Sequence, residues 1–194
     1  MQRLFLFILF GLMGLGVSAE EHSDAHHEGG RVFVGGTFTF WNDTKQHSKM
    51  FEVTPEGGWL FNDTWGVGVM LGYGRETGYD DDIRSKTLSL KLAPFARYYF
   101  YHREPFNLYI DGGFGFNLSK TVKGNDATVD RGFEVGLRPG ACLDLAKGFC
   151  LCLRVGFLGF RKNYFAGEEP EIGKDGFGLR FAPEELQIGL EFEF

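Results

Sequence analysis

Large apolar residues recur at every second position through eight segments of this chain, and this period constrains the fold more than any other feature. The clearest case is the last nine residues, LQIGLEFEF, in which leucine, isoleucine and phenylalanine alternate with glutamine, glycine and glutamate. Successive side chains of a β-strand point to opposite faces, so this period predicts strands with one apolar and one polar face. We therefore predict an all-β protein whose final strand runs to Phe194.

Seven further segments show the same alternation: 31–41, 50–61, 65–74, 87–100, 106–118, 133–145 and 149–160. The connections between segments alternate in length. Short ones lie near Asn62–Asp63, His102–Pro105 and Asp144–Gly148, whereas residues 42–49, 74–86, 119–131 and 161–176 form long polar ones. Short turns at one end and long loops at the other, with an even number of strands, are typical of an up-and-down barrel.

Four short stretches resemble one another and end in proline: FEVTP, LKLAP, VGLRP and LRFAP, at Pro55, Pro94, Pro139 and Pro183. Proline cannot donate to a strand ladder, so inside a closed barrel it predicts a local bulge. The apolar parity also changes between Phe181 and Leu186, which predicts a bulge near Glu184–Glu185.

The aromatic residues indicate that the apolar face meets lipid. They gather near the short turns (Trp59, Phe61, Trp65, Tyr98 and Phe100) and near the long loops (Phe40, Trp41 and Tyr73). Two such girdles suit a membrane with two interfaces, and only a closed barrel lets strands satisfy their backbone groups in lipid. We predict an eight-stranded antiparallel up-and-down transmembrane β-barrel over residues 31–194. A secreted soluble sandwich or a lipocalin-like barrel is the alternative.

The opposite, polar face would line a lumen just wide enough for side chains to fill. Its ionisable residues carry both signs: Glu52, Glu56, Lys91, Arg97, Asp111, Glu134, Arg138, Arg154, Glu191 and Glu193. Buried charges are tolerated when they are paired and hydrogen-bonded. We expect an ion-pair network that fills the lumen, with Glu191 and Glu193 paired to Arg97, Arg138 or Arg154. This argues against an open pore and leaves a narrow path for small solutes as an alternative.

The N-terminal residues form two separate regions. Residues 1–19 combine Arg3, an apolar run and a Val-Ser-Ala cleavage site, which predicts a secretory signal peptide. Residues 20–30 form a histidine-rich, acidic periplasmic tail, in which His22, His26 and His27 are candidate ligands for zinc, copper or nickel. We favour the alternative, a solvated spacer. The net charge of −6 argues against nucleic acid as a partner.

Three cysteines lie in the last third of the chain, and all point to the predicted lumen: Cys142, Cys150 and Cys152. A hairpin centred on Ala146 would place Cys142 opposite Cys150, so one hypothesis is a disulfide between these two. The other hypothesis is three small buried thiols that fill the tapered lumen.

The stretches VTPEGGWLFNDTWGVGVMLGYG, APFARYYF, YIDGGFGFN and IGLEFEF make the chain resemble small eight-stranded outer-membrane barrels of the OmpA, OmpX and opacity-protein type. The resemblance implies a place in the bacterial outer membrane, with periplasmic termini and with membrane lipid and lipopolysaccharide as partners. It also implies that the barrel-assembly machinery reads Phe194 as its signal. Family members serve as structural or adhesin-like proteins, and their long loops bind host or matrix ligands.

Catalysis finds little support in the sequence. A lipid-modifying barrel needs a nucleophile and a base at its outer rim, and His47 beside Ser48 is the one neighbouring pair in a long loop. The stretch YDDDIR lacks the regular spacing of a calcium loop. We therefore expect a non-enzymatic protein with no cofactor.

Overall fold

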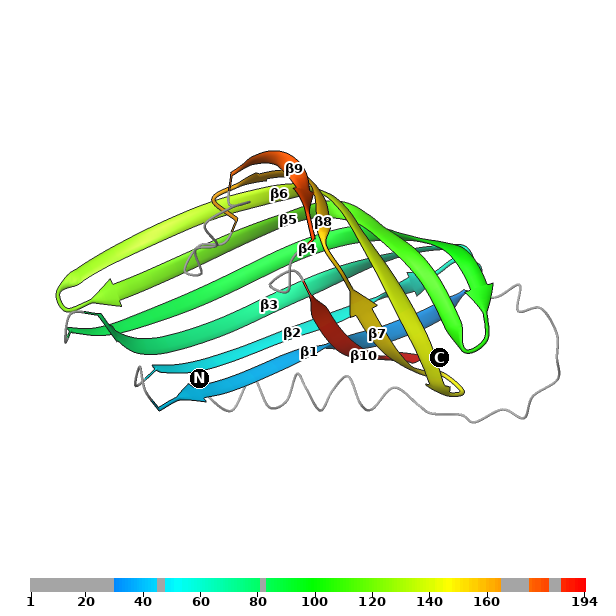
Figure 1. Cartoon of the computed structure of the whole chain (residues 1–194), viewed down its shortest axis with the longest axis horizontal. Helices are drawn as coiled ribbons and strands as arrows, with labels where there is room; N and C mark the ends of the chain where they lie inside the picture. Colours follow the sequence, from blue (N-terminus) through cyan, green and yellow to red (C-terminus); the bar gives the residue numbers. More distant parts are fainter. Residues whose placement is uncertain (1–29, 45–47, 81–82, 165–174, 182–185) are drawn as a thin grey trace.

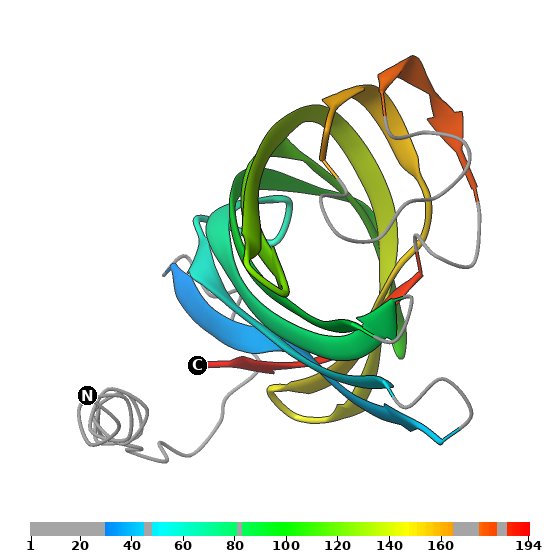
Figure 2. The same ribbon diagram turned by 90° about the vertical axis from the view of Figure 1, so that its left-hand side faces the viewer.

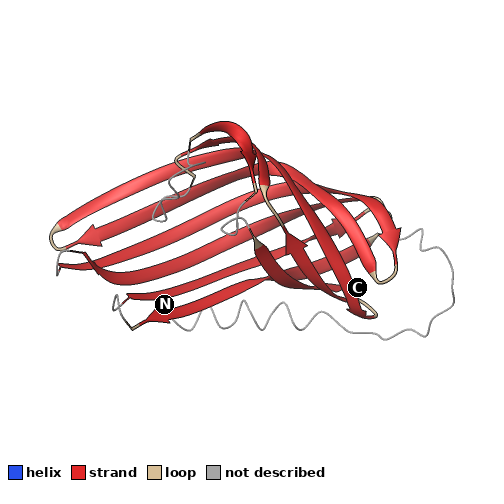
Figure 3. Ribbon diagram, in the orientation of Figure 1, coloured by secondary structure: helices blue, strands red, loops and turns tan. Residues whose placement is uncertain are grey.

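The computed structural model describes residues 30–44, 48–80, 83–164, 175–181 and 186–194, and these form an all-β protein (Figures 1 and 3). Among the described residues, no helix has the length and apolar character needed to cross a membrane. The strands are β1 (Arg31–Asp43), β2 (Ser48–Leu60), β3 (Trp65–Asp80), β4 (Ile83–Arg103), β5 (Phe106–Lys123), β6 (Asp126–Ala146), β7 (Phe149–Arg154), β8 (Phe157–Lys162), β9 (Gly176–Arg180) and β10 (Gln187–Glu193).

These ten segments make a closed barrel of eight antiparallel strands, as predicted. Strands β7 and β8 both pair with β6 and are two halves of the seventh barrel strand, and β9 and β10 are two halves of the eighth. The ring closes where Phe33–Gly36 of β1 pairs with Leu190–Glu193 of β10. The backbone amide of Phe194 continues this ladder by donating to the carbonyl of Val32 at 2.9 Å.

The barrel is inverted relative to a soluble protein. Apolar side chains on the outer face, such as Trp59, Trp65 and Phe192, are about half exposed, whereas Arg97 and Glu191 are fully buried inside. Apolar surface outside and ion pairs inside are stable when the surrounding solvent is hydrocarbon. The soluble alternative is therefore wrong.

The seventh strand departs from the predicted parity. The alternation through 149–160 predicts that Phe157 faces outward, but it is only 2% exposed and points into the lumen. Gly156 adopts φ of 71°, and the register changes by one residue between the β6–β7 and β6–β8 ladders. An extra residue of this kind sends all later side chains to the opposite face.

The prolines behave in two ways. Pro139 lies opposite this extra residue, which agrees with the bulge expected there. Pro55 and Pro94 only interrupt one ladder each, without a change of register, so the bulges expected at these two positions are wrong. A missing N–H removes one hydrogen bond but does not require an inserted residue. Pro183 and the pair Glu184–Glu185 lie outside the described residues.

Two of the predicted long loops are extensions of strands. Strands β3 and β4 remain paired as far as Asp80 and Ile83, and β5 and β6 as far as Lys123 and Asp126. The apolar alternation stops before the strands do, and β-forming threonines continue the pairing, as where the hydroxyls of Thr87 and Thr121 lie 3.1 Å apart. We call this end of the barrel the hairpin end and the opposite end the turn end (Figure 1).

The ring closes along only part of its height. Toward the hairpin end, β9 pairs with β8 alone, and the described part of β1 beyond Gly36 has no partner from the eighth strand. Figure 2 shows the β8–β9 ribbon standing apart from β1. Gly36 has φ of 149°, and a Cβ there would lie 2.5 Å from the carbonyl oxygen of Thr54. The ladder therefore ends at a residue that only glycine fits.

Candidate functional site in the barrel lumen

The middle of the lumen is occupied by a guanidinium group held between two carboxylates. Arg97 of β4 donates to Asp111 of β5 at 2.8 and 3.2 Å, and to both carboxylate oxygens of Glu191 of β10 at 2.9 and 3.2 Å. The strand period brings these residues inward, since Arg97 and Asp111 are also directly paired in the ladder. Both carboxylates therefore pair with the same buried guanidinium group. Such pairing is needed because an unpaired charge is costly in a buried site of low dielectric.

A second arginine extends the network across the barrel. Arg154 of β7 donates to Asp111 at 2.9 Å and to Glu56 of β2 at 2.5 Å. Aromatic rings enclose the Arg97 guanidinium, with the centroid of Tyr109 at 4.2 Å and that of Phe33 at 5.0 Å. Strands from opposite walls are thus joined through the lumen. We call these five charged residues the central network: Glu56, Arg97, Asp111, Arg154 and Glu191.

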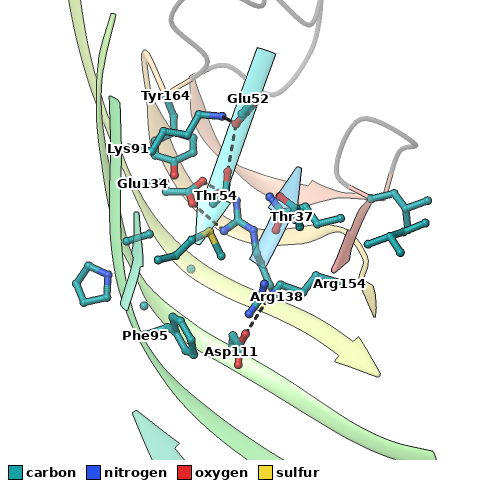
Figure 4. Close-up of a pocket in the computed structure, with 18 of the residues that line it drawn as sticks. Thr37, Glu52, Thr54, Lys91, Phe95, Asp111, Glu134, Arg138, Arg154 and Tyr164 are labelled. Carbon is teal, nitrogen blue, oxygen red and sulfur yellow. Dashed lines mark hydrogen bonds and ion pairs between the residues drawn. The ribbon is translucent and has the colours of Figure 1, made fainter. Parts of the chain in front are cut away.

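Closer to the hairpin end lie three further ion pairs. Glu134 of β6 accepts from Arg138 at 2.7 Å and from Arg161 at 2.8 Å. Lys91 of β4 donates to Glu52 of β2 at 2.9 Å, and about a third of the Lys91 side chain is exposed. Figure 4 shows the Lys91–Glu52 and Arg138–Glu134 pairs at the edge of a shared space.

This space is a cavity of about 430 Å³ in the hairpin half of the lumen (Figure 4). Charged side chains and Tyr164 line it, but so do Phe38 of β1 and Leu186 and Ile188 beside or within β10, which belong to the outer face. Inner and outer residues can line one cavity because the ladder between β1 and the eighth strand has ended there. The cavity therefore reaches the side of the barrel.

Toward the turn end, an apolar layer lies below the central network. Its buried members are Phe33, Leu60, Tyr99, Tyr109, Cys142, Cys150 and Cys152. A packed layer of this kind leaves no room for a continuous water column. The cavity is consequently blind toward the turn end.

The structure brings the predicted lumen residues together, with one change of partner. Lys91, Arg97, Asp111, Glu134, Arg138, Arg154 and Glu191 all take part in the ion pairs described above. Glu193 pairs instead with Arg31 at 3.1 Å. Sequence reasoning missed Arg161, because the parity change at Gly156 turns it inward. A glycine inside an alternating segment is the signal that could have revealed it.

The predicted disulfide between Cys142 and Cys150 is wrong in its pairing. Cys142 lies directly opposite Cys152, and Cys150 lies opposite Asp144, whose carboxylate accepts from its thiol at 3.3 Å. The hairpin turns at Lys147–Gly148, so its centre lies beyond Ala146 and Cys142 meets Cys152 instead of Cys150. Among the described residues, the one group able to offer three metal ligands close together is Cys142, Cys152 and Glu191.

The remaining candidates are not part of this site. His22, His26, His27, His47 and the pair Asp81–Asp82 lie outside the described residues, as do the predicted signal peptide 1–19 and the tail up to residue 29. His102 is exposed at the turn end, where its ring nitrogen lies 3.3 Å from the side-chain oxygen of Asn107.

An eight-stranded barrel with an apolar exterior and a charged, filled interior belongs to the class of integral β-barrel membrane proteins. The model of the family described as outer membrane protein beta-barrel domain matches residues 7–194, so the chain belongs to this family. Its place is accordingly the bacterial outer membrane.

Three solved structures illustrate the likeness. The N-terminal barrel domain of Pseudomonas aeruginosa OprF shares 13% identity at a TM-score of 0.43, covering 86% of this chain and 98% of that one. Neisserial surface protein A shares 17% identity at a TM-score of 0.46, covering 85% of this chain and 97% of that one. The attachment invasion locus protein Ail of Yersinia pestis shares 12% identity at a TM-score of 0.42, covering 86% of this chain and 99% of that one. Values this low say nothing about what this chain binds. A search of curated protein sequences found no significant match.

Proposed function

We propose that this chain is a non-enzymatic outer-membrane barrel that acts at its hairpin end, as a structural or adhesin-like surface protein. The observation that carries the proposal is the contrast between the two ends. Strands β3 to β6 continue as a paired, mostly polar sheet beyond the apolar band, whereas the turn half of the lumen is filled by ion pairs and an apolar layer. Binding is thus better supported than transport.

The orientation in this proposal places the turn end in the periplasm and the hairpin end outside the cell. Short turns are periplasmic in barrels of this class, and longer connections are extracellular. Both termini of the barrel then lie in the periplasm, with a signal peptide removed during export. Phe194, whose backbone is paired with Val32, serves as the residue that the assembly machinery reads.

The charges near the hairpin end suit the outer leaflet. Arg84, Lys86, Lys120 and Arg131 are exposed on adjacent strands β4 to β6, near the hairpin end. Cationic side chains at this level would meet the phosphates of lipopolysaccharide. The strand tips beyond them would meet host or matrix ligands.

The proposal is tested by shortening the hairpin between β5 and β6. Lys120 and Val129 face each other in the ladder, so residues 121–128 can be replaced by an Asn-Gly turn without a change of register. Cells that display this variant should adhere several-fold less to laminin- or fibronectin-coated surfaces than cells with the natural chain. The double variant Arg103→Gln/Lys147→Gln, altered at the turn end, should adhere normally.

A folding control accompanies the adhesion assay. Heat-modifiable migration on a gel shows whether the shortened barrel still folds. Unchanged adhesion of a folded, shortened barrel would contradict the proposal, and so would natural-chain cells that adhere no better than cells lacking the protein.

A narrow porin is the second candidate, and the cavity of about 430 Å³ is the observation that favours it. Single-channel recording in planar bilayers separates the two functions. We expect no discrete conductance steps, because the central network and the layer below it block the lumen. A lipid-modifying enzyme has less support, since the described lining of the cavity contains neither serine nor histidine. Lipid A from a deletion strain should therefore be unchanged.

A further inference from the structure

We propose that Cys142 and Cys152 are joined by a disulfide in the mature barrel and that Cys150 remains a thiol. The first ground is register. All three cysteines are unbonded in the structure, but Cys142 of β6 and Cys152 of β7 are directly opposite in the antiparallel ladder, with their Sγ atoms 2.6 Å apart. Directly opposite residues have Cβ atoms about 4.5–5.5 Å apart, and a small adjustment brings these into the range of a disulfide.

The second ground is that Cys150 has another partner and cannot replace Cys152 as the partner of Cys142. Cys150 points to the same lumen but donates to the Asp144 carboxylate at 3.3 Å. A bridge from Cys142 to Cys150 would require β7 to slip by two residues against β6. That slip would move Arg154 away from Asp111, which it contacts at 2.9 Å. The central network therefore selects the Cys142–Cys152 pairing.

A metal ion is the competing occupant, because the two sulfur atoms and a carboxylate oxygen of Glu191 lie within 4.8 Å of one another. However, the Glu191 carboxylate already accepts from Arg97 at 2.9 and 3.2 Å. A divalent cation bound there would lie next to a buried guanidinium group, and the two positive charges would repel at low dielectric. This charge arrangement favours the neutral disulfide.

Outer-membrane proteins pass through the periplasm, where disulfides form and persist. The co-reactant is a periplasmic dithiol–disulfide oxidoreductase. One cysteine thiolate attacks the disulfide of the oxidant, which forms a mixed disulfide and releases one oxidant thiol. The second cysteine thiolate then attacks the sulfur of the first and expels the other oxidant thiol. Two electrons and two protons leave the chain, and the oxidant is reduced to its dithiol.

The timing follows from burial. Both sulfur atoms lie in the apolar layer at the turn end, with each residue 4% exposed or less. A protein oxidant cannot reach them in the closed barrel, so the bond forms before the ring closes. It then holds β6 and β7 in the register that aims Arg154 at Asp111.

The test counts free thiols on the full-length mature protein extracted from outer membranes. The protein is denatured without reductant, alkylated with N-ethylmaleimide and weighed by mass spectrometry. We expect one adduct before reduction and three after it, with digestion recovering Cys142 linked to Cys152. The Cys150→Ser variant should carry no adduct before reduction and two after it.

Other results would overturn the proposal. Three adducts without reductant mean that the thiols are free. Stoichiometric zinc or copper in the purified protein, with thiols that become reactive after chelation, means that a metal occupies the site. A recovered peptide that links Cys150 to either partner means that the register argument fails. Because Cys150→Ser leaves the proposed bond intact, a folding failure of Cys142 or Cys152 variants would not obscure the result.

Discussion

The two halves of the lumen hold their charges in different ways. In the turn half, Arg97 is fully buried and bonded to two carboxylates, and the ring is closed by the β1–β10 ladder. In the hairpin half, the Lys91–Glu52 pair borders a cavity and is partly exposed, and the ladder has ended at Gly36. Glu134 is also buried in the hairpin half, between Arg138 and Arg161, so the contrast concerns the Lys91–Glu52 side, where charges are held less tightly than around Arg97.

The largest expected effect comes from removing the central cation. Arg97→Met leaves the carboxylates of Asp111 and Glu191 without this partner in a buried site, which costs about 3–5 kcal/mol. Urea unfolding of the reconstituted barrel, followed by tryptophan fluorescence, measures this loss.

The matched change in the hairpin half is Lys91→Met. A partly exposed ion pair contributes at most about 1 kcal/mol to the free energy of unfolding. The urea concentration at the unfolding midpoint of this variant should therefore be close to that of the natural chain. Equal losses in the two variants would remove the distinction between the halves.

A smaller loss is expected where the parity change places an aromatic ring under a guanidinium group. Phe157→Ala removes a buried ring that lies 3.7 Å from the Arg161 guanidinium, and truncating a buried phenylalanine costs about 3 kcal/mol. Phe177→Ala, at a side chain that is 79% exposed, is the control and should cost much less. If Phe157 faced lipid instead, the two variants would unfold alike in urea.

A loss smaller than that of Phe157→Ala is expected at the residue where the ladder ends. Gly36→Ala forces a Cβ to within 2.5 Å of the Thr54 carbonyl oxygen at a φ that side chains rarely adopt, at a cost of about 1–3 kcal/mol. Gly178→Ala is the control, since a Cβ there meets nothing within 4 Å. Thermal unfolding of both variants in the same detergent makes the comparison. A Gly36→Ala barrel as stable as Gly178→Ala would show that β1 adapts easily at this point.

Alternation predicts the strand count and which residues share a face, because side chains alternate between two faces along a strand. The aromatic girdles then predict that the apolar face meets lipid and that the charges point inward. Alternation fails where one residue is inserted. Gly156 reverses the faces of Phe157 and Arg161. The partner of Cys142 is missed for another reason, since the hairpin turns at Lys147–Gly148 and not at Ala146. In β3 to β6 the strands also remain paired beyond the end of the apolar alternation. Hydrogen bonding between strands continues outside the hydrocarbon layer, where apolar side chains are no longer needed. The sequence carries no sign that the β1–β10 ladder ends at Gly36.

The outer part of β6 belongs to the sheet that β3 to β6 form beyond the rest of the barrel. On β6 the described ladder with β8 stops at Phe133, and no described strand pairs with the outer part of β6 on that side. An open edge is a template for pairing with another chain, and charged side chains discourage such pairing. Asp126, Asp130 and Arg131 stand on this segment, and all are exposed. Charges at these positions would discourage pairing between this segment and the same segment of a neighbouring copy.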